Sequence, residues 1–293
     1  MKILITGSSG FIGSHLSPLL SGQHEIYHLS SDLRNHAAVR FEVREKQPDI
    51  IVHLGARTEV EQSFYEQITF SEINYVGTVN LIEISREIPN FKNFVFASTM
   101  EVYGQQPEGT VCDHLTTPYP NAPYAVAKYG CEKYLEYAGR SYNLPYTIIR
   151  QTNCYGRKDN DFFVTEQIIS QMIKNPEEIN LGYAEPYRNF IYIDDMLEAW
   201  TKIINNPEKC NHKIFTLGPD EPIKIRDYVN IIAQKLQWQG EINWDTKPHR
   251  PGEIYWLNSS GKLLEDTLGW KPKVSLSDGL DRTIAWWRNV AKR

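Results

Sequence analysis

Short apolar runs alternate with amphipathic segments through the first half of the chain. Runs at residues 2–6, 25–29, 50–54, 94–98 and 146–150 have the length and side chains typical of β-strands. Helical patterns follow the first, third and fourth of them. The clearest helix spans residues 124–142 and is ended by Asn143, Leu144 and Pro145. Strands that alternate with helices predict an α/β fold with a doubly wound parallel sheet.

The pattern changes near Gly156, where stretches rich in proline and aromatic residues replace the regular alternation. We therefore expect residues 1–155 to form the first domain and residues 156–293 to form mainly a second, smaller α/β lobe. Residues 191–204 and 214–217 again show helix and strand patterns, so the segment 188–217 is expected to return to the first domain. Pro18 lies in the helix expected after Gly13 and should bend or shorten it.

A glycine-rich turn follows the first predicted strand and opens a helix. Its residues are Gly7, Gly10, Phe11, Ile12 and Gly13, with serines at positions 8 and 9. Glycines in this pattern allow a tight turn and bring free backbone N–H groups close to a pyrophosphate. An ordinary strand-to-helix loop is the simpler alternative, but the position directly after the first strand favours a dinucleotide site of the Rossmann type.

The end of the second strand bears on which dinucleotide is bound. NAD usually requires a carboxylate there for the ribose 2'-hydroxyl, whereas NADP requires small polar groups and a cation for the 2'-phosphate. The strand ends at Ser30 and Ser31, followed by Asp32, Leu33 and Arg34. This order favours NADP as the cofactor. NAD remains the alternative, because Asp32 could still reach the ribose or the adenine and Arg34 could be a solvated surface residue.

Composition narrows the classes of partner. The chain has 293 residues, 41% of them hydrophobic, and 31 Lys and Arg against 36 Asp and Glu, a net charge of −5. It therefore lacks the basic surface of a nucleic-acid-binding protein. The apolar run at the N-terminus is too short for a signal sequence or a membrane span. The cysteines, at positions 112, 131, 154 and 210, show no paired spacing, and the histidines show no metal-ligand spacing. We expect a cytoplasmic protein without a bound metal.

Tyr124 and Lys128 are four residues apart and therefore share one face of the predicted helix. An ammonium beside a phenol stabilises the phenolate, lowers its pKa and makes it a usable base for a sugar hydroxyl. Any helix can carry this spacing by chance. Its place downstream of the glycine-rich turn and of the segment 94–104 makes the pair a candidate for catalysis.

The order of motifs resembles a known family. The glycine-rich turn is followed by His-Leu-Gly-Ala at 53–56, Asn-Tyr-Val-Gly-Thr at 74–78, Ser-Thr-Met-Glu-Val-Tyr-Gly at 98–104 and the Tyr-x-x-x-Lys pair. This order resembles the extended short-chain dehydrogenases/reductases of the NAD-dependent epimerase/dehydratase family, which modify nucleotide sugars. The resemblance is greatest to GDP-mannose 4,6-dehydratase-like enzymes. It implies that Leu54, Gly55 and Ala56 also contact the cofactor.

The resemblance implies roles for the residues that match. Thr99 would bind the C4 hydroxyl, Tyr124 would deprotonate it, and Lys128 would also hold the nicotinamide ribose. Glu101 would remove the C5 proton once C4 is a ketone, as in 4,6-dehydratases. The simpler alternative for Glu101 is a structural carboxylate. Met100 stands where dTDP-glucose dehydratases have an aspartate that protonates the leaving hydroxyl, and methionine cannot do this.

Arginines in the second half are candidates for a diphosphate. Guanidinium groups make paired, charge-assisted hydrogen bonds to phosphate. The family pattern implies that Asn153, Arg188 and Arg250 hold a nucleotide diphosphate, with Met100 and Thr99 nearer the sugar. Taken alone, either arginine is more simply a surface ion-pair residue. The expected substrate is therefore a nucleotide-diphosphate sugar whose base the sequence does not identify.

Several functions share these residues. A nucleotide-sugar 4,6-dehydratase is our leading hypothesis. An NADPH-dependent 4-keto-sugar reductase, a C4 epimerase and a UDP-glucuronate decarboxylase are alternatives in the same family. A cofactor-sensing regulator without catalysis is an alternative of another class, against which the joint presence of Thr99, Tyr124 and Lys128 argues. The resemblance also implies a homodimer formed through helices expected around residues 76–86 and 124–142.

Overall fold

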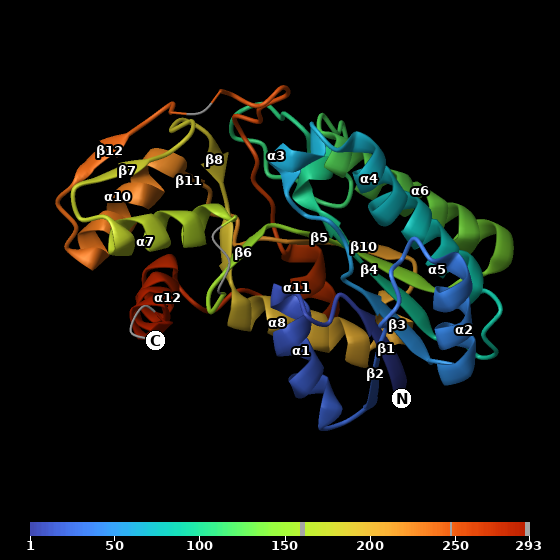
Figure 1. Cartoon of the computed structure of the whole chain (residues 1–293). Coiled ribbons are helices and arrows are strands. Elements are labelled where there is room, and N and C mark those ends of the chain that lie inside the picture. The colour runs from blue at the N-terminus through green and yellow to red at the C-terminus, as the bar shows by residue number, and fades with distance from the viewer. Residues whose placement is uncertain (159–161, 247, 291–293) are drawn as a thin grey trace.

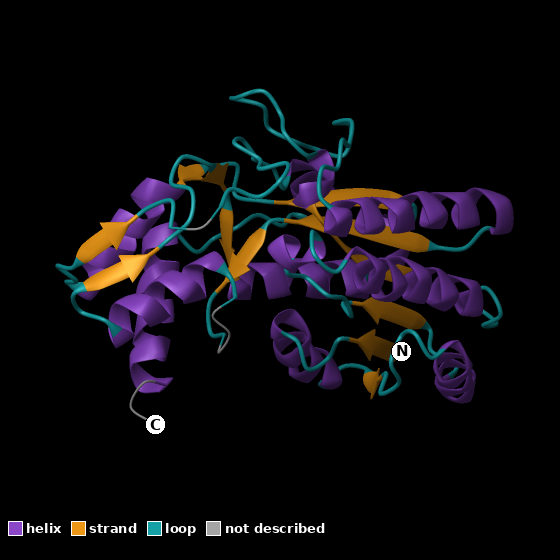
Figure 2. Ribbon diagram, turned by 45° about the horizontal axis from the view of Figure 1, so that its top comes forward, coloured by secondary structure: helices purple, strands orange, loops and turns teal. Residues whose placement is uncertain are grey.

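The computed structural model describes residues 1–158, 162–246 and 248–290. At its centre is a six-stranded parallel sheet with helices on both faces (Figures 1 and 2). The strand order is β10-β5-β4-β3-β1-β2. These strands are β1 (Lys2–Thr6), β2 (Glu25–His28), β3 (Ile50–His53), β4 (Asn93–Thr99), β5 (Tyr146–Gln151) and β10 (Lys213–Leu217). The predicted α/β fold with a doubly wound sheet is confirmed.

Alternate side chains of each strand pack against opposite helical layers, because successive residues of a strand point to opposite faces. In β1, Ile3 and Ile5 belong to the core under α1 and α8, whereas Leu4 belongs to the core under α2, α5 and α6. Both faces are thus covered, which explains the nearly continuous apolar runs. The helices are α1 (Phe11–Ser21), α2 (His36–Lys46), α5 (Gly77–Ser85), α6 (Pro123–Tyr142) and α8 (Ile193–Asn205).

The chain changes direction at the centre of the sheet. It runs from β1 through α1 to β2 on one side, and then through α2 to β3 on the other side of β1. In open α/β sheets, ligands bind outside the carboxyl ends of the strands at such a point. The glycine-rich turn follows β1 directly and therefore lies at this crevice.

Two helices differ from the sequence expectation. α1 continues past Pro18 to Ser21, so the proline does not shorten it. The helix expected at residues 76–86 begins earlier, as α4 (Gln67–Ser71), passes through a π-helical turn, η1 (Glu72–Val76), and continues as α5. A π-helical turn is frequent at functional sites. Here it contains Asn74, which is fully buried.

The remaining strands, and most of the remaining helices, follow β5. β9 (Phe190–Tyr192) pairs with β6 (Asn153–Tyr155) and leads into α8, and β10 then pairs with β5 as the sixth strand of the sheet. β8 (Tyr187–Arg188) pairs with β11 (Ile223–Lys224), and β7 (Glu178–Asn180) with β12 (Glu241–Asn243). The other helices are α3 (Val60–Ser63), η2 (Met100–Tyr103), α7 (Val164–Lys174), α9 (Pro207–Cys210), α10 (Ile225–Leu236), α11 (Lys262–Leu268) and α12 (Leu276–Val290).

The two parts of the chain share one apolar core. Ile168 of α7, Tyr228 of α10 and Leu280 of α12 belong to the same buried cluster as Ile3 and Trp200. The second part is therefore packed firmly on the first. Among the described residues, no helix is long and apolar enough to cross a membrane.

Candidate active site

The glycine-rich turn has a backbone that only glycine accepts. Gly7 has φ +68°, and a Cβ there would lie 2.7 Å from the backbone nitrogen of Gly55. A Cβ at Gly13 would overlap the carbonyl oxygen of Gly7. Gly10 occupies the N-cap of α1 and has no side chain to cover the first-turn amides. Phe11 and Ile12 begin α1, and their side chains pack on the core. Their backbone N–H groups belong to the first turn of the helix and form a cradle that fits a pyrophosphate.

Two cations that our sequence analysis did not select lie beside this cradle. Arg157 and Lys158 line a depression of about 220 Å³ together with Ser9, Gly10, Phe11, Ser14 and His15. Lys158 is buried, and its ammonium lies 3.1 Å from the centre of the Phe163 ring. Burial lowers the pKa of Lys158 to about 8. Two adjacent cations directly after Gly156 were the signal available in the sequence.

Residues 54–56 lie against the glycine-rich turn and are held from behind. The Thr6 hydroxyl accepts a hydrogen bond from the Gly55 amide (2.9 Å) and bonds to His53 Nδ1 (2.6 Å). His53 Nε2 in turn bonds to the Thr78 hydroxyl (2.8 Å). Burial lowers the pKa of His53 to about 3, so the ring is neutral and serves as a structural link. Leu54 and Ala56, on either side, are half-buried.

The segment after β2 has a different set of contacts from the one its sequence suggests. Both oxygens of Glu42 on α2 accept hydrogen bonds from Ser30 and Ser31. Asp32 binds Arg34 through paired hydrogen bonds, the shortest 2.6 Å, and both side chains are half exposed. Leu33 is buried and lies against Gly77 of α5.

Thr99, Tyr124 and Lys128 come together where β4 ends beside α6. Thr99 is the last residue of β4, and its hydroxyl accepts a hydrogen bond from the Glu101 amide (3.2 Å). Tyr124 forms a side-chain hydrogen bond with Thr99. Lys128, one turn further along α6, donates to the carbonyl oxygen of Ala97 (2.9 Å). The spacing in the sequence thus corresponds to one cluster, in which Tyr124 and Lys128 are 7% and 2% exposed.

The electrostatics of this cluster differ from the simple expectation. Burial raises the pKa of Tyr124, the carboxylate of Glu101 raises it further, and the hydrogen bond with Thr99 acts in the opposite direction. Burial also lowers the pKa of Lys128 to about 8. The expectation that the ammonium lowers the phenol pKa is therefore wrong for the protein alone, because Lys128 is directed to a backbone carbonyl. Ligands that bring charge and hydrogen bonds into the cluster can change this balance.

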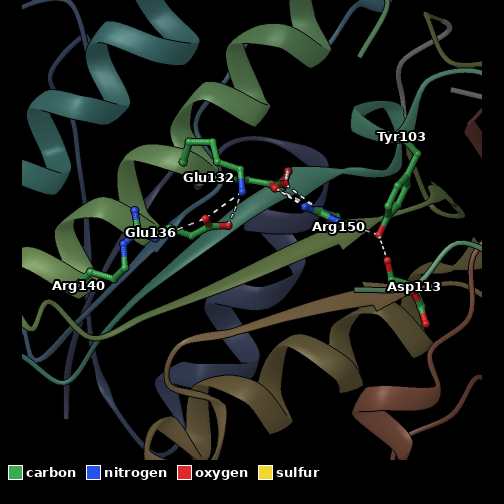
Figure 3. A network of polar contacts seen from close by, with 8 residues as sticks. Tyr103, Asp113, Glu132, Glu136, Arg140 and Arg150 are labelled. Carbon is green, nitrogen blue, oxygen red and sulfur yellow. Dashed lines mark hydrogen bonds and ion pairs between the residues drawn. The ribbon is translucent and has the colours of Figure 1, made fainter. Parts of the chain in front are cut away.

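A buried ion pair between Arg150 and Glu132 links β5 to α6, and Ser98 of β4 joins the same network (Figure 3). Arg150 at the end of β5 donates to Glu132 of α6, with a shortest distance of 2.6 Å, and to the Tyr103 hydroxyl at 3.0 Å. Ser98, next to Thr99, also donates to Glu132. Tyr103 donates to the carbonyl oxygen of Asp113 at 2.6 Å. The network therefore sets the position of Thr99 relative to α6.

Glu101 is within electrostatic range of both the Tyr124 cluster and two arginines. Its carboxylate raises the pKa of Tyr124 and also acts on Arg188 and Arg250. Both arginines bind Glu253, Arg250 at 2.8 Å and Arg188 at 3.4 Å. The structure thus brings Glu101, Arg188 and Arg250, which are far apart in the sequence, to one place. Glu253 organises the arginine pair and is a residue to which our sequence analysis assigned no role.

Three other residues, Asn153, Met100 and Cys131, make contacts of other kinds. Asn153 is exposed on β6, and its amide donates to the carbonyl oxygen of Asn189 (3.3 Å). Met100 is 3% exposed and packs in a small apolar cluster, where Ser259 donates to its sulfur (3.3 Å). Cys131 donates to the carbonyl oxygen of Asn74, and burial raises its pKa to about 12. A thiol so bound is a poor proton donor at neutral pH. Among the described residues, no cluster of His, Cys, Asp and Glu could hold a metal ion.

Residues 3–218 match the model of the NAD dependent epimerase/dehydratase family. The chain is 29% identical to a putative UDP-glucose 4-epimerase of Methanocaldococcus jannaschii, over 98% of both chains. It is 26% identical to a GDP-6-deoxy-D-mannose reductase of Pseudomonas aeruginosa, over 98% of this chain and 97% of that one. A human dTDP-D-glucose 4,6-dehydratase is 25% identical, over 99% and 93%. Relatives with different reactions are thus about equally distant.

Solved structures are similar over the whole chain. A UDP-glucose 4-epimerase of Thermotoga maritima with UDP-glucose has a TM-score of 0.92 and 26% identity, over 99% of this chain and all of that one. A UDP-glucose 4-epimerase of Thermus thermophilus in complex with NAD has a TM-score of 0.90 and 27% identity, over 98% and 99%. Their fold is that of the chain described above.

Proposed function

Because the chain belongs to the NAD-dependent epimerase/dehydratase family, we propose that it is a nucleotide-sugar 4,6-dehydratase. The observation that carries the proposal is that Glu101, whose amide binds the Thr99 hydroxyl, is close enough for its carboxylate to act on the pKa values of both Tyr124 and Arg188. Oxidation or reduction at C4 needs one acid-base group at the C4 oxygen, and Tyr124 is available for that. A second proton-transferring group beside it has a use only when a second proton moves, as it does from C5 in a dehydration.

Tyr124 and its neighbours handle the proton at the C4 oxygen. The phenolate of Tyr124 takes the C4 hydroxyl proton, while the Thr99 hydroxyl hydrogen bonds to the same oxygen and orients it. Lys128 supplies the positive charge that stabilises the phenolate once the bound ligands draw its ammonium into the cluster. A bound nicotinamide cofactor supplies the hydride acceptor at C4 and the hydride that is returned at C6.

Glu101 carries out the step that distinguishes a dehydratase. A C4 ketone makes the C5 proton acidic, and the carboxylate of Glu101 accepts that proton. Glu101 then gives the proton to the C6 oxygen. The C6–O bond breaks, water leaves, and a double bond forms between C5 and C6. When the hydride is returned to C6, C5 takes up one proton and Tyr124 gives up the proton that it accepted from the C4 hydroxyl. Tyr124 and Glu101 thus end in their starting protonation states, and the sugar has lost one water. The reaction is redox-neutral overall.

Two basic groups of residues are proposed for the two diphosphates. Arg188 and Arg250, arranged by Glu253, would hold the diphosphate of the sugar nucleotide, and exposed Asn153 would add a hydrogen bond. Arg157 and Lys158 would assist the α1 cradle in holding the pyrophosphate of the dinucleotide. Under this proposal, residues 156–293 supply most of the nucleotide-sugar site, whereas residues 1–155 supply most of the dinucleotide site and the catalytic groups.

Exposed apolar side chains support a homodimer. Ile68, Val76 and Val126 on α4, η1 and α6 are 72%, 42% and 56% exposed. These helices contact one another, so they can present one apolar face, and such faces often mark protein interfaces. We propose that two copies associate through α4, η1 and α6. Light scattering should give a dimeric mass, and a monomer at all concentrations would contradict the proposal.

The test is to incubate the purified protein with GDP-, UDP-, CDP- and dTDP-hexoses and with UDP-glucuronate, adding only a catalytic amount of NAD or NADP. Mass spectrometry should show loss of one water from one substrate, with no net change in cofactor absorbance. Glu101→Gln should abolish water loss yet retain exchange of hydride at C4. An isomer of unchanged mass would instead indicate an epimerase, and loss of carbon dioxide would indicate a decarboxylase.

A 4-keto-sugar reductase is the second candidate. It is supported by the similarity to the GDP-6-deoxy-D-mannose reductase. In that case a 4-keto sugar would consume one equivalent of reduced cofactor. Glu101→Gln would then have little effect, since reduction at C4 needs Tyr124 and no second base.

A further inference from the structure

We propose that Glu42 makes this enzyme select NAD over NADP by engaging the hydroxyl protons of Ser30 and Ser31. The inference rests on the dinucleotide site of the proposed function and names a specificity residue within it. It also reverses the preference for NADP that the serines suggest when only the sequence is considered.

The location follows from the sheet. β2 pairs with β1 in parallel, so its carboxyl end lies beside the glycine-rich turn that follows β1. In Rossmann sites the residues at this end contact the adenosine ribose and distinguish a 2'-hydroxyl from a 2'-phosphate. Ser30 is exposed and Ser31 is half-buried at this position. Glu42 comes from the second half of α2 and reaches back to this segment through its carboxylate.

The hydrogen bonds have a definite direction. The Ser30 amide donates to one oxygen of Glu42 at 2.9 Å, and the Ser30 hydroxyl donates to the other at 2.8 Å. The Ser31 hydroxyl donates to that same oxygen. Against the opposing effect of burial, these bonds from Ser31 and Ser30 lower the pKa of Glu42. The carboxylate is therefore ionised at neutral pH, and both serine protons are taken.

A ribose 2'-hydroxyl and a 2'-phosphate would interact differently with Ser30, Ser31 and Glu42. A 2'-hydroxyl has a proton of its own and can donate to the free lone pairs of Ser30, Ser31 or Glu42. A 2'-phosphate is an acceptor with about two negative charges near pH 7, and the serines have no hydroxyl proton left for it. It would also meet the like charge of Glu42. The site therefore accepts the hydroxyl and repels the phosphate.

Arg34 is the cation of this segment that could reverse the preference. It is bound to Asp32 through paired hydrogen bonds, but both partners are half exposed, and exposed pairs contribute little stability. A phosphate could compete for Arg34, which would leave Asp32 as a second uncompensated carboxylate. The pair is neutral as a unit, so Glu42 supplies the net charge of the site.

The experiment measures dissociation constants for NADH and NADPH by nicotinamide fluorescence, confirmed by calorimetry with NAD and NADP. The wild-type protein should bind NAD at least about tenfold more tightly than NADP, a difference of about 1.4 kcal/mol. Glu42→Gln should reduce this ratio about tenfold, mainly by strengthening NADP binding, because the amide removes the charge and can donate to a phosphate. Glu45→Gln is the matched control, since it removes an exposed carboxylate on the same helix that pairs with Lys46.

The outcomes separate the two proposals. Wild-type protein that binds NADP as tightly as NAD, or a ratio unaltered by Glu42→Gln in a protein of normal thermal stability, overturns the role of Glu42. If Glu42→Gln does not fold, Ser31→Ala serves instead. It keeps the carboxylate, so the preference for NAD should persist within about threefold. Failure to bind either dinucleotide would overturn the proposed function itself, and the role of Glu42 with it.

Discussion

Lys128 and Glu132 lie one turn apart on α6 and are equally buried, yet their surroundings are opposite. Glu132 is fully buried and accepts hydrogen bonds from Arg150 and Ser98. Lys128 is 2% exposed, and in the part of the chain that the structure describes its ammonium has a single hydrogen-bond acceptor, the carbonyl oxygen of Ala97. The charge of the Glu132 carboxylate is fully compensated, whereas the Lys128 ammonium has more N–H donors than acceptors around it in that part of the chain.

The difference separates a structural charge from a functional one. A buried charge is tolerated when partners replace its lost hydration, and hydrogen bonding to Glu132 raises the pKa of Arg150 despite its burial. Among the described residues, no carboxylate binds the Lys128 ammonium, which donates to the Ala97 carbonyl and lies 4.9 Å from the centre of the Phe96 ring, and burial lowers its pKa to about 8. A site that contains a desolvated cation of this kind lowers the folding stability of the protein, and the cation is available to interact with a ligand. We therefore propose that Lys128 is the functional member of the pair.

The largest expected effect comes from Lys128→Met, which keeps the length of the side chain and removes the charge. Turnover should fall about 10³-fold, because the phenolate of Tyr124 loses the cation that stabilises it. The free energy of unfolding should rise by about 1–3 kcal/mol, since a desolvated charge is replaced by an apolar chain. Steady-state kinetics and urea denaturation measure the two. If the variant is both inactive and less stable, Lys128 has a structural role.

Glu132→Ala should have the opposite effect on the free energy of unfolding. It leaves the Arg150 guanidinium buried without its carboxylate, so the free energy of unfolding should fall by about 3–5 kcal/mol. Glu136→Ala, one turn further along α6, is the matched control. Glu136 pairs with Lys133 near the surface, and its loss should cost less than about 1 kcal/mol. Equal losses in the two variants would mean that the buried network of Figure 3 does not secure α6.

The smallest of the three effects is a dependence on pH. Lys128 has its ordinary pKa of 10.5 in the unfolded chain and about 8 in the folded protein. Below pH 8 both states are protonated, and the folded state bears the full cost of the buried charge. Between pH 8 and 10.5 the unfolded state binds more protons, so this group makes stability rise with pH, by about 2–4 kcal/mol in all.

The measurement is the difference in unfolding free energy between wild type and Lys128→Met from pH 7 to 10.5, so that the other titrating groups cancel. The stability advantage of the variant should shrink as pH rises through 8. An advantage that stays constant over this range would show that Lys128 remains charged in the folded protein and that its burial is compensated.

The sequence by itself determined the local framework of this protein. The apolar run of β1, the glycines that follow it and the spacing of Tyr124 and Lys128 on α6 could all be recognised, because strand alternation, helical periodicity and left-handed glycine are properties of neighbouring residues. The order of these motifs was enough to indicate the family. Element ends were less certain, as the uninterrupted passage of α1 through Pro18 shows.

Tertiary structure alone decided which charges are compensated. Arg150 reaches Glu132, Arg188 and Arg250 converge on Glu253, and Glu42 accepts hydrogen bonds from Ser30 and Ser31, the contact on which our proposal of a preference for NAD rests. In most of these pairs the partners lie on different strands, helices or loops. The sequence shows which side chains are available, but their distances and burial follow from the packing of the sheet and its helices. Because pKa values and the proposed cofactor preference depend on those distances, they follow from the folded structure and not from the order of residues alone.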